Sequence, residues 1–112
     1  MKKIGGNTEA VLQKFESTEN AIGEAVKTWS DVVTIKGFLD MIGEDTDIGS
    51  FKTKLQQSTH VFICDFFPLP FLVESGNSRL IINGGVYDIL FIDDPMGLSG
   101  HYEFYLKYTG GK

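Results

Sequence analysis

The sequence predicts an all-β fold: a small antiparallel β-barrel of about six strands, with a long loop or short helix inserted after the second strand. Apolar residues recur at every second position in several short runs, which is the period of a half-buried strand. The chain also has 13 glycines in 112 residues, and frequent glycine favours turns. No segment has the apolar stripe of a core helix. This length predicts a single domain, residues 1–112.

The strands are expected near residues 9–16, 31–42, 58–66, 78–83, 86–93 and 101–108. Gly37 lies within the second run and indicates a bulge or a bend there. The polar segment Ser17–Ser30 is interpreted as an interruption between the first two strands, with Trp29 folding back onto the barrel. The last run is the clearest strand, because its apolar positions alternate strictly: Tyr102, Phe104, Leu106 and Tyr108.

A long polar segment, residues 43–57, follows the second strand. It reads "GEDTDIGSFKTKLQQ" and has too few apolar residues for a core helix, although Phe51 and Leu55 fit a helical turn or two. Loops of this length inside small domains usually have a function. The start of the segment, "DTDIGS", faintly resembles a calcium loop, but its glycine is misplaced and Gln56 stands where the closing glutamate belongs.

The segment after the third strand, "FFPLPFLV", is the most apolar part of the chain. A barrel of this size cannot easily bury all of it, so one interpretation is an exposed patch that a partner covers. A loop folded over the open end of the barrel is an equally good interpretation. The candidate interface residues are Phe66, Phe67, Leu69, Phe71 and Leu72.

Two turns are expected in the C-terminal third. Asn-Gly between two β-rich runs is a strong hairpin signal, because both turn positions need positive φ. The pair Asp93 and Asp94 could be a metal-binding pair, but Asp before Pro opens turns and no further ligands follow at telling spacing, so we favour a turn. The candidate turn residues are Asn83, Gly84, Gly85, Asp94, Pro95, Gly97 and Gly100.

Composition and motifs argue against most chemistry. A net charge of −5 disfavours a broad phosphate-binding face. The single Cys64 excludes an internal disulfide, and His60 and His101 have no metal-ligand spacing. No nucleophile elbow, phosphate loop or dinucleotide motif occurs. The start "MKKIGGNTEA" lacks the apolar core of a signal peptide, and no run can span a bilayer. We therefore expect a cytoplasmic protein that is not an enzyme, with no metal, cofactor or membrane partner.

The stretch Arg79–Leu106 resembles the closing strands of the head-completion, or stopper, proteins of long-tailed bacteriophages. Those proteins share an arginine-led strand, a glycine hairpin, a strand ending in "I-x-D-P", a loop "x-x-L-S-G" and a final strand with a glutamate. The earlier part of the chain is similar in layout more than in residues. The matching residues are Arg79, Gly84, Tyr87, Ile92, Asp94, Pro95, Leu98, Ser99, Gly100 and Glu103.

The resemblance implies a structural subunit of the virion head–tail connector, assembled in the bacterial host cytoplasm. Copies of the chain, which could be monomeric when isolated, would form a ring, expected to be dodecameric, below the portal-adaptor protein. This ring would close the DNA-filled head and dock a tail-completion or tail-terminator protein. Phage DNA would pass without sequence-specific binding. By position, the family's channel-facing insertion is 43–57 here, with candidate gating residues Gly43, Glu44, Asp45, Asp47, Gly49, Lys52 and Lys54.

Two alternatives stay open at this point. The chain could have another phage connector role, as an adaptor, a tail-completion protein or a minor capsid protein. It could also be a monomeric barrel, similar to an oligonucleotide-binding fold, that binds a ligand or oligonucleotide through Tyr102, Tyr105 and Tyr108.

Overall fold

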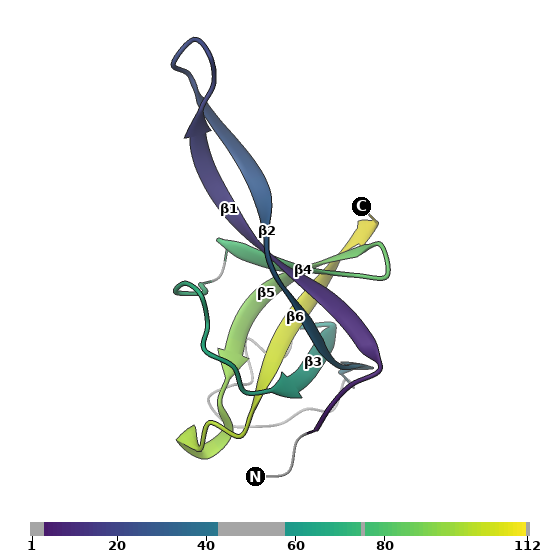
Figure 1. The fold of residues 1–112 in the computed structure, drawn as a ribbon. Coiled ribbons are helices and arrows are strands. Elements are labelled where there is room, and N and C mark those ends of the chain that lie inside the picture. The colour runs from purple at the N-terminus through teal and green to yellow at the C-terminus, as the bar shows by residue number, and fades with distance from the viewer. Residues whose placement is uncertain (1–3, 43–57, 75, 112) are drawn as a thin grey trace.

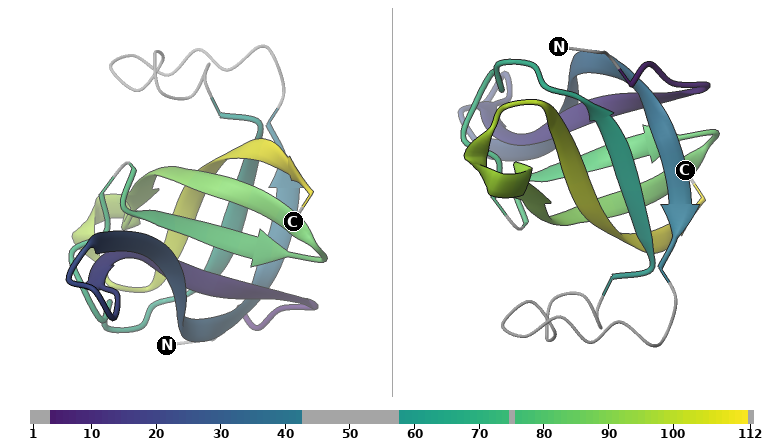
Figure 2. Two further views of the ribbon diagram at one scale, coloured as in Figure 1. Left: turned by 90° about the horizontal axis from the view of Figure 1, so that it is seen from above. Right: turned by 90° about the horizontal axis from the view of Figure 1, so that it is seen from below.

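The computed structural model describes residues 4–42, 58–74 and 76–111, and in this part of the chain it confirms the predicted antiparallel β-barrel. Six strands close into a ring in the order β1-β2-β3-β6-β5-β4, and all neighbours are antiparallel (Figures 1 and 2). The strands are β1 (Thr8–Glu19), β2 (Ala25–Met41), β3 (His60–Asp65), β4 (Ser78–Ile82), β5 (Gly85–Asp93) and β6 (His101–Gly111).

Alternate side chains of these strands fill the barrel. On β6, the predicted inward row holds as far as Leu106, while Tyr108 lies at the barrel end and is half exposed. The rings of Phe62 and Phe104 meet edge-on at 6.4 Å in the centre of the core, and both are fully buried. The remaining buried apolar side chains are Ala10, Leu12, Ile35, Cys64, Leu80, Ile82, Tyr87, Ile89 and Tyr102.

Strand β2 changes partner at Gly37, which pairs with Thr8 of β1 on one side and with Cys64 of β3 on the other. A Cβ atom at this glycine would collide with the carbonyl oxygen of Ile63 and would lie 2.7 Å from the ring of Phe62. Gly37 therefore allows the close approach at which β2 bends from one partner to the next. The β1–β2 register shift lies elsewhere, between Leu12 and Gln13.

The prediction that Ser17–Ser30 interrupts the strands was wrong. Most of this segment continues β1 and β2 as a two-stranded arm that projects from the barrel (Figure 1). Its turn is closed by Asn20, whose side chain accepts hydrogen bonds from the backbone of Ile22 and Glu24, and by Gly23 at φ +83°. Because both faces of the arm meet water, the sequence has no apolar alternation to reveal it.

Trp29 does not fold back as a loop residue. It lies in β2 at the base of the arm, with its ring 4.8 Å from that of Phe15 and the guanidinium of Arg79 4.2 Å from the ring centroid. Beside it, Gln13 donates to Asp31 at 2.6 Å and accepts from Arg79 Nε at 2.7 Å. These contacts join the arm to β4 of the barrel.

The Asn-Gly turn of the C-terminal third has the backbone that its residues favour. Asn83 and Gly84 join β4 to β5 with φ of +50° and +79°. A short 3₁₀ turn, η2 (Pro95–Gly97), follows β5. Asp94 precedes it and accepts a hydrogen bond on Oδ1 from the backbone N–H of Ser99 at 2.9 Å. Asp93, by contrast, ends β5 and pairs with Glu103 of β6.

Candidate functional site

A groove of about 830 Å³ lies beside β5. One wall is the segment 69–74, which connects β3 to β4, and the other is the second half of β5. The buried ring of Tyr102 reaches it from the core. The lining residues are Leu69, Phe71, Leu72, Val73, Glu74, Ile89, Leu90, Phe91, Ile92, Asp94 and Tyr102.

The groove exists because β4 is shorter than β5. The β4–β5 ladder runs from Ile82↔Gly85 to Arg79↔Asp88, whereas β5 continues to Asp93. Between Ile89 and Asp93, the ladders of the described strands pair β5 with β6 alone. A register shift at Leu90 bends this stretch.

The outer wall is fixed by Asn77 rather than by the sheet. The side-chain amide of Asn77 donates to the carbonyl of Leu72 at 2.9 Å, and its oxygen accepts from the backbone N–H of Glu74 at 2.8 Å. The hydroxyl of Ser78 donates to the Glu74 carbonyl at 3.3 Å. The position of the wall is therefore set by the beginning of β4.

The charged residues that line the groove are both acidic. Glu74 is exposed on the outer wall, and Asp94 directly follows β5. Tyr102 lies near Asp94, and its pKa is raised above the usual tyrosine value, first by burial and then by electrostatic interactions with Asp94 and Cys64. The groove therefore combines an apolar lining with a negative rim.

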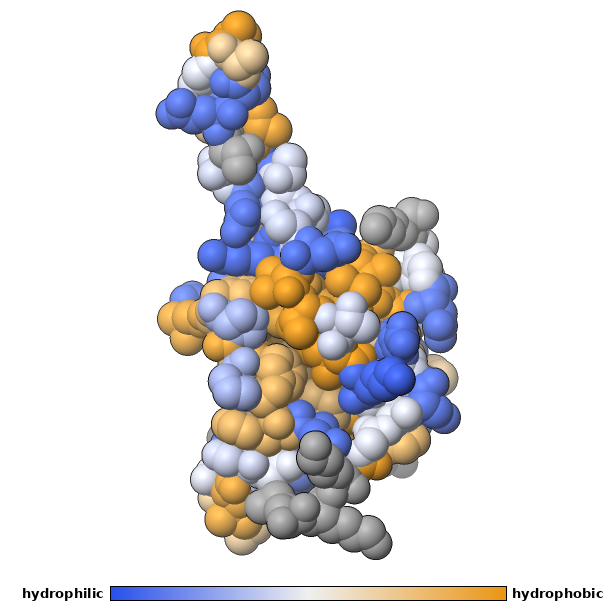
Figure 3. All heavy atoms as spheres, viewed as in Figure 1, coloured by the Kyte–Doolittle hydropathy of each residue, from blue (hydrophilic) through white to orange (hydrophobic). Residues whose placement is uncertain are grey.

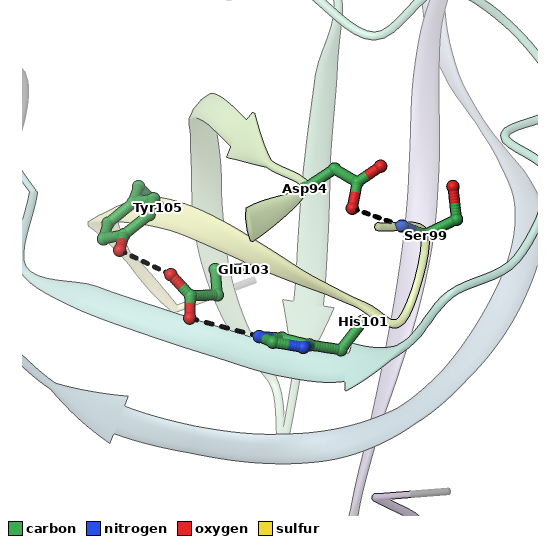
Figure 4. Close-up of polar contacts among 5 residues, drawn as sticks. All are labelled: Asp94, Ser99, His101, Glu103 and Tyr105. Atoms are coloured by element: carbon green, nitrogen blue, oxygen red, sulfur yellow. Dashed lines mark hydrogen bonds and ion pairs between the residues drawn. The ribbon is translucent and has the colours of Figure 1, made fainter. Parts of the chain in front are cut away.

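A second set of polar contacts lies on the outer face of β6 (Figure 4). Glu103 lies between its neighbours on the strand, accepting from the Tyr105 hydroxyl at 2.8 Å and lying 3.3 Å from Nε2 of His101. The ring of Tyr105 also stacks on Phe91 at 4.5 Å. Burial and the hydrogen bond to Glu103 raise the pKa of Tyr105, so it stays a neutral donor. The set holds β5 and β6 together from outside.

The predicted interface residues fall into two groups. Phe67, Leu69 and Phe71 are half-buried and pack against the core, whereas Phe66 and Leu72 are exposed, Leu72 by 76%. The segment thus packs one set of side chains against the core and presents the other to solvent. The predicted gating residues, Gly43, Glu44, Asp45, Asp47, Gly49, Lys52 and Lys54, lie outside the described residues.

The tyrosines proposed for oligonucleotide stacking do not share a face. Tyr102 points into the core, Tyr105 stacks on the outside, and Tyr108 lies at the barrel end. There, Tyr108 contacts Tyr87 and His60, with ring centroids 5.1 and 6.3 Å apart, beside a hollow of about 300 Å³.

Side chains that could bind a metal ion are not gathered into a cluster in residues 4–42, 58–74 and 76–111. No cluster of three or more His, Cys, Asp or Glu side chains that could hold a metal occurs there. Burial, followed by the charge of Asp65, raises the pKa of the Cys64 thiol to about 12, which removes its nucleophilic form near neutrality. In the same residues, no helix is long and apolar enough to cross a bilayer.

Sequence reasoning missed two features of this surface. The arm could have been found from Asn20 and Gly23, because an asparagine followed by a glycine three residues later is a turn signal. The groove had no comparable signal, since it arises from the different lengths of β4 and β5.

Comparisons with known proteins show the fold and no more. No family model and no curated protein matches the sequence. The solution structure of protein SF1141 from Shigella flexneri 2a, from the Northeast structural genomics consortium, is similar with a TM-score of 0.70. The match covers 100% of both chains at 15% sequence identity.

Proposed function

We propose that this protein is a structural subunit of a bacteriophage head–tail connector, a head-completion protein that assembles into a ring. The observation that carries the proposal is the exposure of apolar side chains at separate places around a barrel that has its own core. Ile22 at the arm tip is 77% exposed, Leu72 on the groove wall 76%, and Met96 in η2 89%. A ring of identical copies needs two different surfaces on each subunit, and separate apolar patches can supply them.

The arm favours an assembly role because the barrel core does not need it. Beyond the base formed by Trp29, the arm is polar along most of its length and apolar again at its tip (Figure 3). Such an arm can reach a neighbouring subunit and place Ile22 against it. In the proposed ring, it is one of the two subunit contacts.

The resemblance of Arg79–Leu106 to head-completion proteins supplies the more specific part of the proposal. The residues that carry it form β4, β5, η2 and β6, including the Asp94–Ser99 hydrogen bond and the outer-face contacts of Glu103. The insertion 43–57 connects β2 to β3, where Ile42 N–H donates to the Thr59 carbonyl at 3.1 Å. A chain with net charge −5 suits a channel that DNA passes without being held.

The test is assembly onto isolated phage heads. Purified protein should add to tail-less, DNA-filled heads as a ring visible by electron microscopy below the portal-adaptor protein, and those heads should then accept tails. Ile22→Ser should keep the melting temperature but reduce ring formation, whereas Val32→Ser, at an exposed position on the same strand pair but away from the tip, should do neither. A connector that contains no copy of this chain would refute the proposal.

The other phage roles, as adaptor, tail-completion or minor capsid protein, use the same exposed patches and differ in where the ring is found. A monomeric ligand-binding barrel is favoured by one observation, the hollow of about 300 Å³ lined by His60, Tyr87 and Tyr108. Oligonucleotide binding that is lost in Tyr108→Ala, by a protein that stays monomeric with heads present, would support that alternative.

A further inference from the structure

A further hollow, here called the β2 hollow, lies between β2 and the chain that follows β3. It measures about 270 Å³. The rings of Phe66 and Phe67 lie 4.9 and 5.6 Å from the buried ring of Tyr102, so the core holds this side of the hollow in place. The lining residues are Val33, Thr34, Ile35, Lys36, Asp65, Phe66 and Phe67.

The charge of the β2 hollow differs from that of the two hollows already described. The groove beside β5 has two carboxylates, and no lysine or arginine of the described residues lines the hollow at the barrel end. The β2 hollow includes Lys36, which is exposed. Its one carboxylate, on Asp65, accepts hydrogen bonds from the backbone N–H groups of Ile4 and Gly5 at 2.6 and 3.0 Å. An apolar side chain flanked by acidic residues therefore fits the β2 hollow better than it fits the acidic groove.

The tip of the arm is such a segment. The sequence from Glu19 to Ala25, "ENAIGEA", has two carboxylates and no basic residue, and Ile22 at its centre is 77% exposed. Asn20 holds the turn in shape, because its side chain accepts from the backbone of Ile22 and Glu24 at 3.0 and 2.9 Å. An apolar cavity of about 150 Å³ can hold benzene. The β2 hollow thus has room for the smaller side chain of Ile22.

The tip cannot reach the hollow of its own copy. Both lie along β2, which is one continuous strand, and Val33 is eight positions after Ala25. Eight residues of strand span about 26 Å, and the arm points away from the barrel (Figure 1). A tip that fills the hollow must therefore come from a second copy. Because tip and hollow are different surfaces, the contact is head-to-tail and can repeat from copy to copy until a ring closes.

We propose that the arm tip of one copy binds the β2 hollow of the next copy. Ile22 enters the hollow, and the carboxylates of Glu19 and Glu24 lie near Lys36. The inference rests on the proposed ring, since it names the surface that receives the arm there. Contact between two tips is the poorer arrangement, because it would bring four carboxylates together.

The test is disulfide trapping in the full-length chain. Ala21→Cys places a thiol beside Ile22, Thr34→Cys places one in the lining of the hollow, and both positions are exposed. An equimolar mixture of the two variants at about 1 mM should form mixed dimers. A chain that carries both cysteines should form a ladder of trimers and larger species. The native Cys64 is fully buried and stays out of the reaction.

Added substitutions separate the apolar contact from the charge contact. Ile22→Ser should slow the formation of mixed dimers about tenfold or more. Lys36→Glu should slow it about threefold, and Glu19→Lys with Glu24→Lys on the other chain should restore the rate. Lys107→Glu makes the same change of net charge toward the far end of β6, where the lysine is exposed, and should change the rate less than about twofold.

Several results would overturn the proposal. Absence of mixed dimers at about 1 mM would do so. Equal trapping of Ala21→Cys by Leu72→Cys, on the wall of the acidic groove, would show that the hollow is not selected. Homodimers of Ala21→Cys that form faster than mixed dimers would show that tips meet each other. An unchanged rate in Lys36→Glu would exclude the charge contact.

Trapping within assembled particles separates this contact from the connector function. Connectors that contain the chain but give no crosslink between positions 21 and 34 would overturn the arm contact alone. Trapping in the purified protein, for a chain that no connector contains, would overturn the connector function alone.

Discussion

Gln13→Leu should lower the free energy of unfolding by about 2 kcal/mol, through loss of the polar contacts at the arm base. Gln13 is only 4% exposed and bridges two charged side chains, donating to Asp31 at 2.6 Å and accepting from Arg79 at 2.7 Å. A hydrogen bond to a charged group contributes about 1.5–3 kcal/mol.

The net loss is smaller than the sum of the two bonds. Asp31 is exposed, so water replaces its lost donor at little cost. Arg79 is half-buried, and although it keeps its contact with Trp29, its Nε loses the acceptor that Gln13 provided. The added leucine gains some apolar burial. A loss of about 2 kcal/mol corresponds to a fall in Tm of roughly 6–10 °C for a domain of this size.

The assay is urea unfolding followed by two signals. Trp29 is the chain's only tryptophan and lies at the arm base, so its fluorescence reports this region, while far-UV circular dichroism reports the barrel. Glu9→Gln, an exposed change on the same strand, is the control. A loss below about 0.5 kcal/mol, the range of ordinary surface substitutions, would refute the reasoning.

Three further predictions follow from single residues. Gly37→Ala should prevent folding or yield insoluble protein, because its Cβ has no space; a soluble variant with native amide NMR signals would contradict this. The Cys64 pKa is raised from 9.0 to about 12, so the contribution of the protonated thiol to the free energy of unfolding is fully present below about pH 9 and is lost as pH rises toward 12. The free energy of unfolding measured across that window should fall less in Cys64→Ala than in the wild type, and equal slopes would contradict this. Asp94→Ala removes the acceptor for the Ser99 N–H and should cost about 1 kcal/mol in urea unfolding, whereas Asp93→Asn should stay within about 0.5 kcal/mol; the reverse order would be inconsistent with the turn.

The barrel interior could be predicted from sequence because burial on one face of a strand forces a period of two. Phe104 and Leu106 follow that rule and are fully buried. The Asn83-Gly84 hairpin was also within reach, since positive φ restricts the residues that can occupy such a turn.

The period of two could not reveal the arm or the groove, for physical reasons. A hairpin exposed on both faces is under no pressure to alternate, so Ser17–Ser30 gave no strand signal. The division of Phe66–Val73 into half-buried and exposed side chains depends on which of them meet the core. The groove depends on where β4 begins relative to β5. These are relations between distant segments, and local patterns do not record them.

The closure of the barrel between β1 and β4 also has a kinetic consequence. The contact between Gln13 and Arg79 joins residues 66 positions apart, and the ladder around it seals the first strand of the barrel to the fourth. Contacts of such long range must await the closing of a large chain loop, which places folding of β-barrels in the millisecond-to-second range. Until β4 pairs, the edges of β1 and β5 are both bare, and a chain leaving the ribosome is most open to mispairing in that interval.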